Sequence, residues 1–353
     1  WLTRFAALRH PVRNPDLLLA DLQAQVAANR SGASALLALI ERQGLAEVQR
    51  YMAHVQANAA AAVQRLIDRL QPGQCTLPLD DGGCIVVCVT IVKASQDPSS
   101  PPRLRIDFSG SSPQHAGNRN APLAVTKAVV LYVIRCLVAE SIPLNAGCFA
   151  PLELIVPPGT LLNPLPPAAV VAGNVEISQA TANALLLALG AQAASQGTMN
   201  NLSFGDGQRQ YYETIGGGCG AGAQSPGGSG FQSHMTNSRL TDPEVLEERL
   251  PLRLERMGYR TGSGGLGRWR GGDGVVRQLR FLSPMQLSLI SGSRQVAPPG
   301  LEGGRSGAPG RNVLVDVDGS ERELPGCCQL TIRAGQALRI ETPGGGGFGP
   351  ADS

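Results

Sequence analysis

The sequence has little excess charge and few aromatic side chains, and both shortages limit the partners that it can bind. Among 353 residues, 30 lysines and arginines stand against 27 acidic residues, the formal charge is +3, and aromatic residues make up 4%. No block of like charge occurs, and no basic stretch is interleaved with aromatic residues. Nucleic-acid binding normally needs such a basic patch. We therefore expect no nucleic-acid partner.

No apolar run is long enough to cross a bilayer. The best candidate, residues 121–140, is interrupted by Lys127 and Arg135, whereas a span needs about 20 predominantly apolar residues. The sequence begins at Trp1 without the basic and apolar pattern of a signal peptide. We expect a cytoplasmic protein with no membrane partner, and we interpret the sequence as a fragment of a longer protein.

Metal-binding residues are also sparse. The four histidines are dispersed, and the eight cysteines show neither the spacing of a zinc site nor the density of a disulfide framework. We expect reduced thiols and no metal site in this chain. Cys219 has no histidine close to it in the sequence, which disfavours a role as nucleophile.

Length and composition predict a globular protein of two domains. A chain of 353 residues with 42% hydrophobic content exceeds the roughly 250–300 residues at which single cores stop growing. We place the domains at residues 1–150 and 151–353. The expected fold class is α+β, with a helical N-terminal region, a mixed α/β central region that holds the cleft, and a β-rich C-terminal region.

Apolar periodicity predicts where the helices and strands lie. A helix should begin at Asn14, Pro15 and Asp16 and end near Gly32, and further helices should cover residues 45–70, 123–139 and 175–194. A β-hairpin is expected from residues 84–92 and 104–108. Short strands are expected at residues 152–156, 202–204, 210–214, 275–281, 286–290, 313–317 and 337–341.

The stretch from Ala172 to Leu246 combines amides, hydroxyls and carboxylates with glycine-rich turns and apolar runs. Its segments AGNVEISQ, ASQGTMNN, YYETIGGGCGAG and HMTNSRLTDPEVLE stand beside helix-forming sequence, so many of their polar groups must lie near a core. A buried polar group without a partner costs about 1–3 kcal/mol. This stretch therefore predicts a binding cleft.

Three glycine segments match the spacing of a dinucleotide-binding loop, namely those beginning at Gly216, Gly262 and Gly344. None of them lies between a predicted strand and a predicted helix, as that loop requires. Two interpretations remain, glycine turns and backbone nests that hold an anion.

Two segments of the cleft hold candidate site residues, and each has a structural alternative. His234, Asn237, Arg239 and Asp242 form a dense mixture of basic, amide and acidic groups. In the same segment, Thr241, Pro243 and Glu244 have the pattern of a helix capping box, which needs no catalysis.

The other segment precedes a predicted helix. Glu176 in its first turn serves either a site or the helix dipole, and Asn174 and Gln179 beside it favour a site.

Many ordered segments of the chain resemble the hydantoinase B/oxoprolinase family. They are RNPDLLLADLQAQVAANR, GNRNAPLAVT, IPLNAGC, AAVVAGNVEISQ, ASQGTMNN, YYETIGGG, HMTNSRLTDPEVLE, GSGGLGRWRGGDGVVR and TPGGGGFG. The resemblance runs essentially from end to end. Within the family, QGLAEVQRYMAHVQANA and SQGTMNN are most similar to the C-terminal portion of 5-oxoprolinases. The segment SGSRQVAPPGL departs from the family pattern, because it keeps only Arg294 where relatives often have two arginines.

The resemblance implies the ATP-dependent opening of a cyclic amide. A hydantoinase A part phosphorylates the lactam oxygen, and the B part then hydrolyses the activated ring. Such chemistry needs a general base, donors for developing negative charge, and the exclusion of bulk water. The implied catalytic residues are Glu176, Glu213, His234 and Asp242. The implied substrate-binding groups are Asn174, Gln179, Asn200, Asn201, Asn237, the backbone of residues 216–218, and Arg239 for a substrate carboxylate.

The resemblance also implies cofactors and partners outside this chain. ATP with Mg²⁺ belongs to the hydantoinase A part, a divalent-metal site is expected upstream of Trp1, and the chain alone should lack ATPase activity. We expect a hydantoinase A-like domain or subunit and a second copy of the chain as partners. Three alternatives stay open: the B subunit of an N-methylhydantoinase, a subunit of an acetone or acetophenone carboxylase-like ligase, and a scaffold or dimerisation module.

Overall fold

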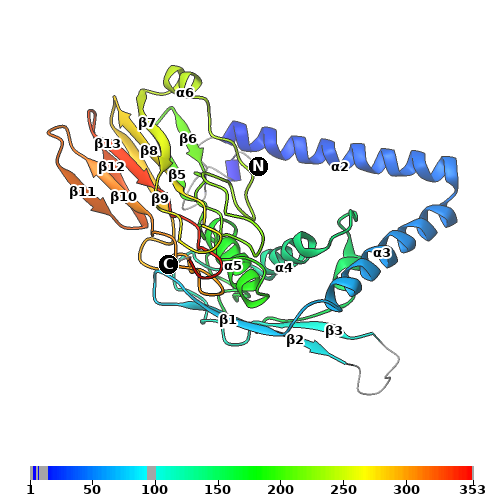
Figure 1. Cartoon of the computed structure of the whole chain (residues 1–353). Coiled ribbons are helices and arrows are strands. Elements are labelled where there is room, and N and C mark those ends of the chain that lie inside the picture. Colours follow the sequence, from blue (N-terminus) through cyan, green and yellow to red (C-terminus); the bar gives the residue numbers. More distant parts are fainter. Residues whose placement is uncertain (1–2, 5–6, 8–14, 94–100, 352–353) are drawn as a thin grey trace. The chain divides into compact units, whose positions relative to one another are not determined.

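The computed structural model describes residues 3, 4, 7, 15–93 and 101–351. The chain divides into two compact units, one formed by residues 1–61 with 142–147 and the other by residues 62–141 with 148–353. The domain boundary expected near residue 151 stays a prediction. The expected class is confirmed, because helices dominate the N-terminal region and strands the C-terminal region (Figure 1).

Two long helices make up most of the described part of the first unit. Helix α2 covers Pro15–Gln43 and α3 covers Leu45–Ile67, with Gly44 between them at a φ of 82°. The prediction that the first helix ends at Gly32 was wrong. Nothing lies within 4 Å of the place where a Cβ of Gly32 would be, and one exposed glycine costs a helix only about 1 kcal/mol. The predicted start at Asn14 lies outside the described residues.

A four-stranded sheet opens the second unit. Its strands are β1 (Gly73–Pro78), β2 (Cys84–Val92), β3 (Arg103–Asp107) and β4 (Leu152–Ile155), in that order. Strands β2 and β3 are antiparallel, which confirms the predicted hairpin, whereas β4 joins β3 in parallel. Strand β1 was not predicted, since its sequence lacks a clear alternation and ends in proline.

Helices α4 (Leu123–Leu137) and α5 (Ser178–Ala188) pack against each other, and α5 also packs on β1 and β2. Short turns at Ala146–Phe149 and Gly173–Ile177 complete this region, the second of them a π-helix that leads directly into α5. The predicted helix over residues 175–194 is therefore too long. It ends before Gly190, which has a φ of 63°, and the following residues bond to glycine segments instead, as when the Ala193 amide donates to Ala221.

The C-terminal region contains two sheets that share one hydrophobic core. One has the order β11-β10-β13-β8-β7 and the other the order β12-β9-β5-β6. Phe204 and Leu287 from the second sheet belong to the same buried cluster as Phe281 and Leu338 from the first. The bounds are β5 (Asn201–Gly205), β6 (Gln210–Glu213), β7 (Leu252–Arg260), β8 (Gly274–Phe281), β9 (Met285–Ile290), β10 (Arg311–Val315), β11 (Glu321–Leu324), β12 (Cys327–Ile332) and β13 (Ala337–Glu341), with the short helix α6 at Pro243–Arg249. Each strand predicted in this region is present, while β7, β11 and β12 were missed.

Glycine-rich segments pack backbone against backbone beside these sheets. They comprise residues 216–222, 227–230, 262–274, 300–307 and 344–349. A run of amide-to-carbonyl bonds crosses them, from Gly345 to Gly272, from Gly272 to Cys219 and from Cys219 to Gly228, each of 2.9 Å. A Cβ on Gly272 would lie 1.9 Å from the Gly228 oxygen. Of the two interpretations of the three dinucleotide-like motifs, the structure supports close-packed turns, because these amides already have acceptors.

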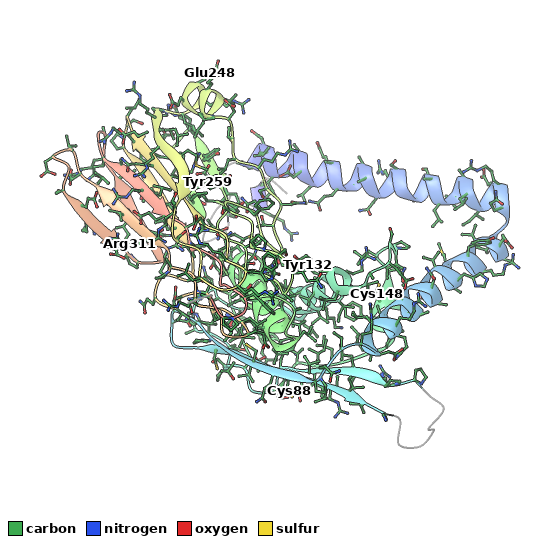
Figure 2. The ribbon with its side chains drawn as sticks, in the orientation of Figure 1. Cys88, Tyr132, Cys148, Glu248, Tyr259 and Arg311 are labelled. Atoms are coloured by element: carbon green, nitrogen blue, oxygen red, sulfur yellow. The ribbon has the colours of Figure 1, made fainter. Side chains whose placement is uncertain are left out.

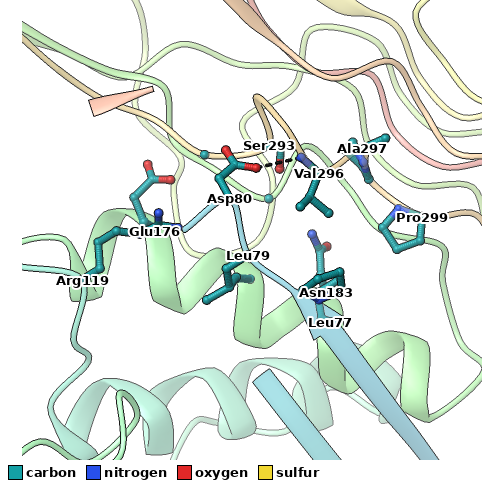
Figure 3. Close-up of a pocket in the computed structure, with 15 residues that line it drawn as sticks. Leu77, Leu79, Asp80, Arg119, Glu176, Asn183, Ser293, Val296, Ala297 and Pro299 are labelled. Carbon is teal, nitrogen blue, oxygen red and sulfur yellow. Dashed lines mark hydrogen bonds between the residues drawn. The ribbon is translucent and has the colours of Figure 1, made fainter. Parts of the chain in front are cut away.

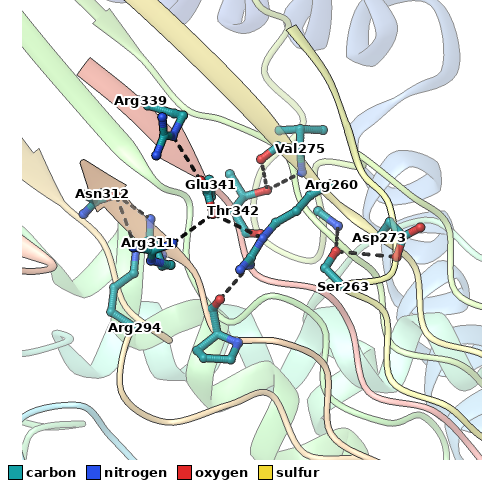
Figure 4. A network of polar contacts seen from close by, with 12 residues as sticks. Arg260, Ser263, Asp273, Val275, Arg294, Arg311, Asn312, Arg339, Glu341 and Thr342 are labelled. Carbon is teal, nitrogen blue, oxygen red and sulfur yellow. Dashed lines mark hydrogen bonds and ion pairs between the residues drawn. The ribbon is translucent and has the colours of Figure 1, made fainter. Parts of the chain in front are cut away.

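Polar side chains tie the glycine segments to the strands (Figure 4). The Thr342 hydroxyl accepts a 2.8 Å bond from the Val275 amide. It also donates a 2.9 Å bond to the Gly216 oxygen. The Asp273 carboxylate accepts a 2.7 Å bond from the Gly264 amide. Buried backbone groups need hydrogen-bond partners, and these side chains provide them for the glycine segments.

The described residues contain no helix with both the length and the apolarity of a membrane span. All eight cysteines are free thiols, including Cys88 and Cys148, which are labelled in Figure 2.

Candidate active site

The candidate site is centred on Glu176, which the π-helix places at the wall of a pocket (Figure 3). In that turn the amides of Glu176 and Ile177 both donate to the Ala172 oxygen, at 3.0 and 3.2 Å. Glu176 lies within this turn and is 2% exposed. Such π-turns inside helices are frequent at functional sites.

Two donors hold one oxygen of the Glu176 carboxyl group. Thr198 Oγ1 donates to Oε1 at 2.8 Å, and Asn201 Nδ2 donates to the same oxygen at 3.0 Å. The other oxygen, Oε2, lies against Gly292, where an added Cβ would be 2.9 Å away. Because Oε1 already accepts two hydrogen bonds, Oε2 is the oxygen that carries the proton of the neutral acid.

Burial raises the pKa of Glu176 to about 8. Desolvation is the largest cause, and it is opposed by the Thr198 hydroxyl, by the charges of Arg119 and Arg294, and by the Met199 amide. The carboxyl group is therefore poised to exchange a proton near neutral pH. Acids and bases used in catalysis commonly have pKa values in that range.

The segment with Thr198 also carries two predicted amides, and both are buried. Asn201 Oδ1 accepts a 2.7 Å bond from the Tyr212 hydroxyl. Asn200, at a φ of 48°, donates to the Ile215 oxygen at 2.9 Å and accepts a 2.8 Å bond from Arg294. Asn201 thus acts directly on Glu176, and Asn200 holds a charge near it.

Arg294 is the one arginine of the segment SGSRQVAPPGL, where relatives often have two. Its guanidinium donates to the oxygens of Gly292, Asn200 and Asn312 at 2.7–3.0 Å, and burial lowers its pKa to about 10. The Asp80 carboxylate, from the turn between β1 and β2, accepts bonds from the amides of residues 294–296 at 2.7–3.1 Å. Asp80 therefore fixes the loop that carries Arg294.

His234 lies one layer behind the pocket. Asn183, which lines the pocket, exchanges two hydrogen bonds with the Ser195 backbone, so its Oδ1 is identified as an acceptor. His234 Nε2 is 2.9 Å from that oxygen and must carry the proton, and Tyr132 then donates to Nδ1 at 3.3 Å. Burial lowers the pKa of His234 to about 4. A neutral imidazole that orients Asn183 is the result.

Gln179 is buried in the first turn of α5. Its amide group donates to the Ser233 oxygen at 3.0 Å, which positions the backbone next to His234. Its own oxygen has no hydrogen-bond partner among the described residues.

The other predicted site residues do not line this pocket. Glu213 is buried in a two-bond ion pair with Arg277, at 2.7 and 2.9 Å, and also accepts from the Tyr211 hydroxyl. The pair explains why a carboxylate is buried there without assigning it chemistry. Four further residues lie exposed, namely Asn174, Asn237, Arg239 and Asp242.

The predicted capping box is wrong in its first residue. Asp242, not Thr241, is the N-cap of α6, and its carboxylate accepts a 3.0 Å bond from the Glu244 amide. The Thr241 hydroxyl instead donates to the Tyr211 hydroxyl at 2.9 Å, because the Tyr211 proton is given to Glu213.

The amides proposed as donors in residues 216–218 also have partners already. Gly217 donates to Phe231 and Gly218 to Pro343, each at 2.9 Å.

The pocket holds four polar residues that sequence reasoning did not assign to a site, Asp80, Arg119, Asn183 and Ser293. Its cavity volume is about 30 Å³, which exceeds the roughly 10–15 Å³ that one water needs. Arg119 belongs to GNRN, one of the segments that carry the family resemblance, and that was the available signal. Asp80 and Asn183 gave none, because a turn aspartate and a helix asparagine are common in any protein.

Clusters of metal-ligating side chains are absent from the described residues. No group of three histidine, cysteine, aspartate or glutamate side chains comes together in them. The glycine segments, whose spacing resembles a dinucleotide-binding loop, bond to one another. No chemical step is therefore assigned to ATP or to a metal ion within this chain.

Comparison with known proteins places this geometry in context. The sequence profile described as hydantoinase B/oxoprolinase matches residues 3–351. The chain is 46% identical over 347 residues to 5-oxoprolinase 1 of Arabidopsis thaliana, a match that covers 94% of the chain and 27% of the relative. The match falls on the C-terminal portion of that protein, as the sequence predicted. The chain thus spans about a quarter of the curated 5-oxoprolinase that it matches.

Two solved structures share the fold. An ATP-dependent caprolactamase from Pseudomonas jessenii has a TM-score of 0.81 at 22% identity, covering 98% of this chain and 63% of that chain. A nucleotide-free acetone carboxylase has a TM-score of 0.74 at 16% identity, covering 89% of this chain and 50% of that chain. At these identities the likeness shows the fold alone.

Proposed function

The chain belongs to the hydantoinase B/oxoprolinase family, and from that premise we propose that it forms the hydrolytic part of an ATP-dependent cyclic-amide hydrolase. The proposed reaction converts 5-oxo-L-proline, ATP and water to L-glutamate, ADP and phosphate in the cytoplasm. A hydantoinase A-like domain or subunit, outside this chain, binds ATP with Mg²⁺ and activates the lactam oxygen. The identity of 46% with a 5-oxoprolinase favours this substrate over other cyclic amides.

The observation that carries the proposal is the buried, doubly hydrogen-bonded Glu176 with a pKa of about 8. Its carboxylate form accepts a proton at Oε2 from a water that attacks the ring carbonyl carbon. The same oxygen then returns the proton to the ring nitrogen as the carbon–nitrogen bond breaks, and a second water hydrolyses the resulting acyl phosphate to release L-glutamate and phosphate. One group thus acts first as base and then as acid, which requires a pKa near the working pH.

The surroundings of Glu176 suit this role. The cavity of about 30 Å³ has room for water, and we place the cyclic amide at its opening. Arg294 contributes fixed positive charge near the reacting groups, and neutral oxygens hold its guanidinium group in place. Charge that is held in advance of the reaction stabilises developing negative charge without reorganisation.

The test is Glu176→Gln in the complete enzyme, with L-glutamate and ADP measured separately. Loss of a general base commonly lowers turnover about 10²- to 10⁴-fold, so glutamate release should fall by at least about 100-fold. ADP formation should fall much less, because activation takes place outside this chain, and the ratio of ADP to glutamate should rise. Glu248→Gln, at an exposed site on α6, is the matched control and should behave as wild type.

The alternatives give other results. Unchanged glutamate release in Glu176→Gln would contradict the role of Glu176, and ATP-dependent use of a ketone with bicarbonate in place of the lactam would support the carboxylase. The likeness to acetone carboxylase concerns the fold alone and does not favour that reaction. A pure scaffold predicts normal kinetics for every variant of the pocket.

A further inference from the structure

Arg119 is a mostly buried cation at the pocket, and the proposed mechanism gives it no contact with the substrate. It lies in the loop between β3 and α4 and lines the pocket together with Glu176 (Figure 3). Its side chain is 12% exposed, and its nearest carboxylate is Asp81, whose Oδ2 is 3.4 Å from NH1. Its Nε is buried and has no hydrogen-bond partner among the described residues.

The loop that carries Arg119 is held rigidly. The Asn120 side chain accepts from the His115 amide at 2.7 Å and donates to the oxygens of Gly117 and Ala169 at 3.0 and 2.8 Å. Such a closed set of bonds fixes the backbone on both sides of Arg119. Positions held in this way bind a ligand without a further cost of ordering.

The same loop is fastened to the turn that carries Glu176. The Ala172 amide donates to the Asn118 oxygen at 3.0 Å. Gly173 allows this approach, because a Cβ there would lie 2.4 Å from the Asn120 oxygen. The geometry therefore holds Arg119 and Glu176 at one pocket in a fixed relation.

Arg119 keeps donors for a ligand because the nearby carboxylates have other partners. Asp80 accepts three backbone amides, and Asp81 also accepts from the Gly83 amide at 3.1 Å. A guanidinium group presents a planar fork that matches a carboxylate, and a buried N–H without an acceptor is unfavourable.

We infer that Arg119 binds the carboxylate of the substrate, so that the site selects cyclic amides that carry a carboxylate beside the ring nitrogen. This inference rests on the proposed function and names the group that sets its specificity. The sequence had predicted Arg239 for this role, but Arg239 is exposed, whereas Arg119 lines the pocket.

The experiment compares two lactams that differ only in the carboxylate, 5-oxo-L-proline and 2-pyrrolidinone, as ATP-dependent substrates of the complete enzyme. Arg119→Gln should lower kcat/KM for 5-oxo-L-proline at least about tenfold, the size expected for a lost charged hydrogen bond. The loss should appear mainly as a raised KM. Turnover of 2-pyrrolidinone should fall much less than that of 5-oxo-L-proline, because this lactam has no carboxylate to lose and is affected only through the charge that Arg119 places near Glu176.

Two further variants sharpen the result. Arg119→Lys keeps the charge without the fork and should recover part of the loss for 5-oxo-L-proline alone. Arg253→Gln, at an exposed site on β7, is the matched control and should leave both substrates unchanged. Equal thermal midpoints for the variants would show that folding is intact.

Other outcomes overturn the inference. A parallel loss on both lactams would mean that Arg119 serves Glu176 or a phosphate group, and a selective loss in Arg239→Gln in place of Arg119→Gln would return the carboxylate to Arg239. If the wild-type enzyme opens neither lactam, the proposed function fails. Calorimetric binding of 5-oxo-L-proline to wild type and to Arg119→Gln still decides the inference in that case, because equal affinities contradict it.

Discussion

The stability of the protein should fall between pH 6.5 and pH 8 because Glu176 is buried, and Glu176→Gln should remove that fall. The pKa of Glu176 is raised from 4.5 to about 8, so between these values the folded protein holds a proton that the unfolded chain has released. The contribution of protonated Glu176 to the free energy of unfolding is complete below pH 4.5 and is lost as the pH rises through 8. The slope is about 1.4 kcal/mol per pH unit.

His234 has the opposite effect at lower pH. Its pKa is lowered from 6.5 to about 4, so its contribution is complete above pH 6.5 and is lost as the pH falls through 4. The two slopes offset each other where the ranges overlap, which leaves pH 6.5–8 as the window in which Glu176 acts without His234. Across these 1.5 pH units the free energy of unfolding should drop by about 2 kcal/mol.

The assay is urea unfolding of wild type and Glu176→Gln at pH steps through this window. Glutamine keeps an oxygen for Thr198 and Asn201 and places its amide group beside Gly292, so the pocket stays packed. The difference between the two free energies of unfolding should grow by about 2 kcal/mol toward pH 8, with an unchanged urea slope. Parallel curves for the two proteins would refute the reasoning, and Glu248→Gln should follow wild type.

Two further predictions concern the scaffold. Gly218→Ala should destabilise the protein by about 3 kcal/mol or more, because its Cβ would lie 2.1 Å from the Gly272 oxygen and overpacking alone costs about 1–3 kcal/mol. Gly222→Ala is the control, since the atom nearest to its Cβ would be 3.8 Å away. Gly218→Ala should have the lower midpoint in thermal unfolding, and equal midpoints for the two variants would contradict the close packing. Glu213→Ala should cost about 3–5 kcal/mol because Arg277 is left buried without its partner. The double change Glu213→Leu with Arg277→Met should recover most of that loss in chemical unfolding, and a double variant as unstable as the single one would contradict a purely structural pair.

Periodicity predicted the elements whose pattern is local. The predicted hairpin and each of the predicted C-terminal strands are present, since alternation along one strand reports the face that it buries. Helix ends were less predictable. Gly32 stands within α2 while Gly190 follows the end of α5, and the difference lies in tertiary bonding: the residues after Gly190 bond to distant glycine segments, which a local pattern cannot reveal.

The candidate site shows the same division between local and distant information. Glu176, Asn200 and Asn201 were selected from the sequence because polar residues beside apolar runs must be buried. Arg119 and Asp80 reach the pocket from loops 57 and 96 residues before Glu176 in the sequence, and only the fold brings them there. Residue type alone could not separate Arg119 from exposed Arg239.

The glycines around Glu176 show why scaffold and chemistry are linked in this fold. Desolvation raises the pKa of the Glu176 carboxyl group toward neutral pH, and close approach of the neighbouring backbone keeps water away from it. Gly292 meets the Glu176 carboxyl, where a Cβ would lie 2.9 Å from Oε2, and Gly173 admits the loop of Arg119. Gly197, at a φ of 72°, brings Thr198 to the carboxyl. A side chain at any of these positions would push the donors away and let water in. The glycine content of this region therefore helps to set the pKa of Glu176.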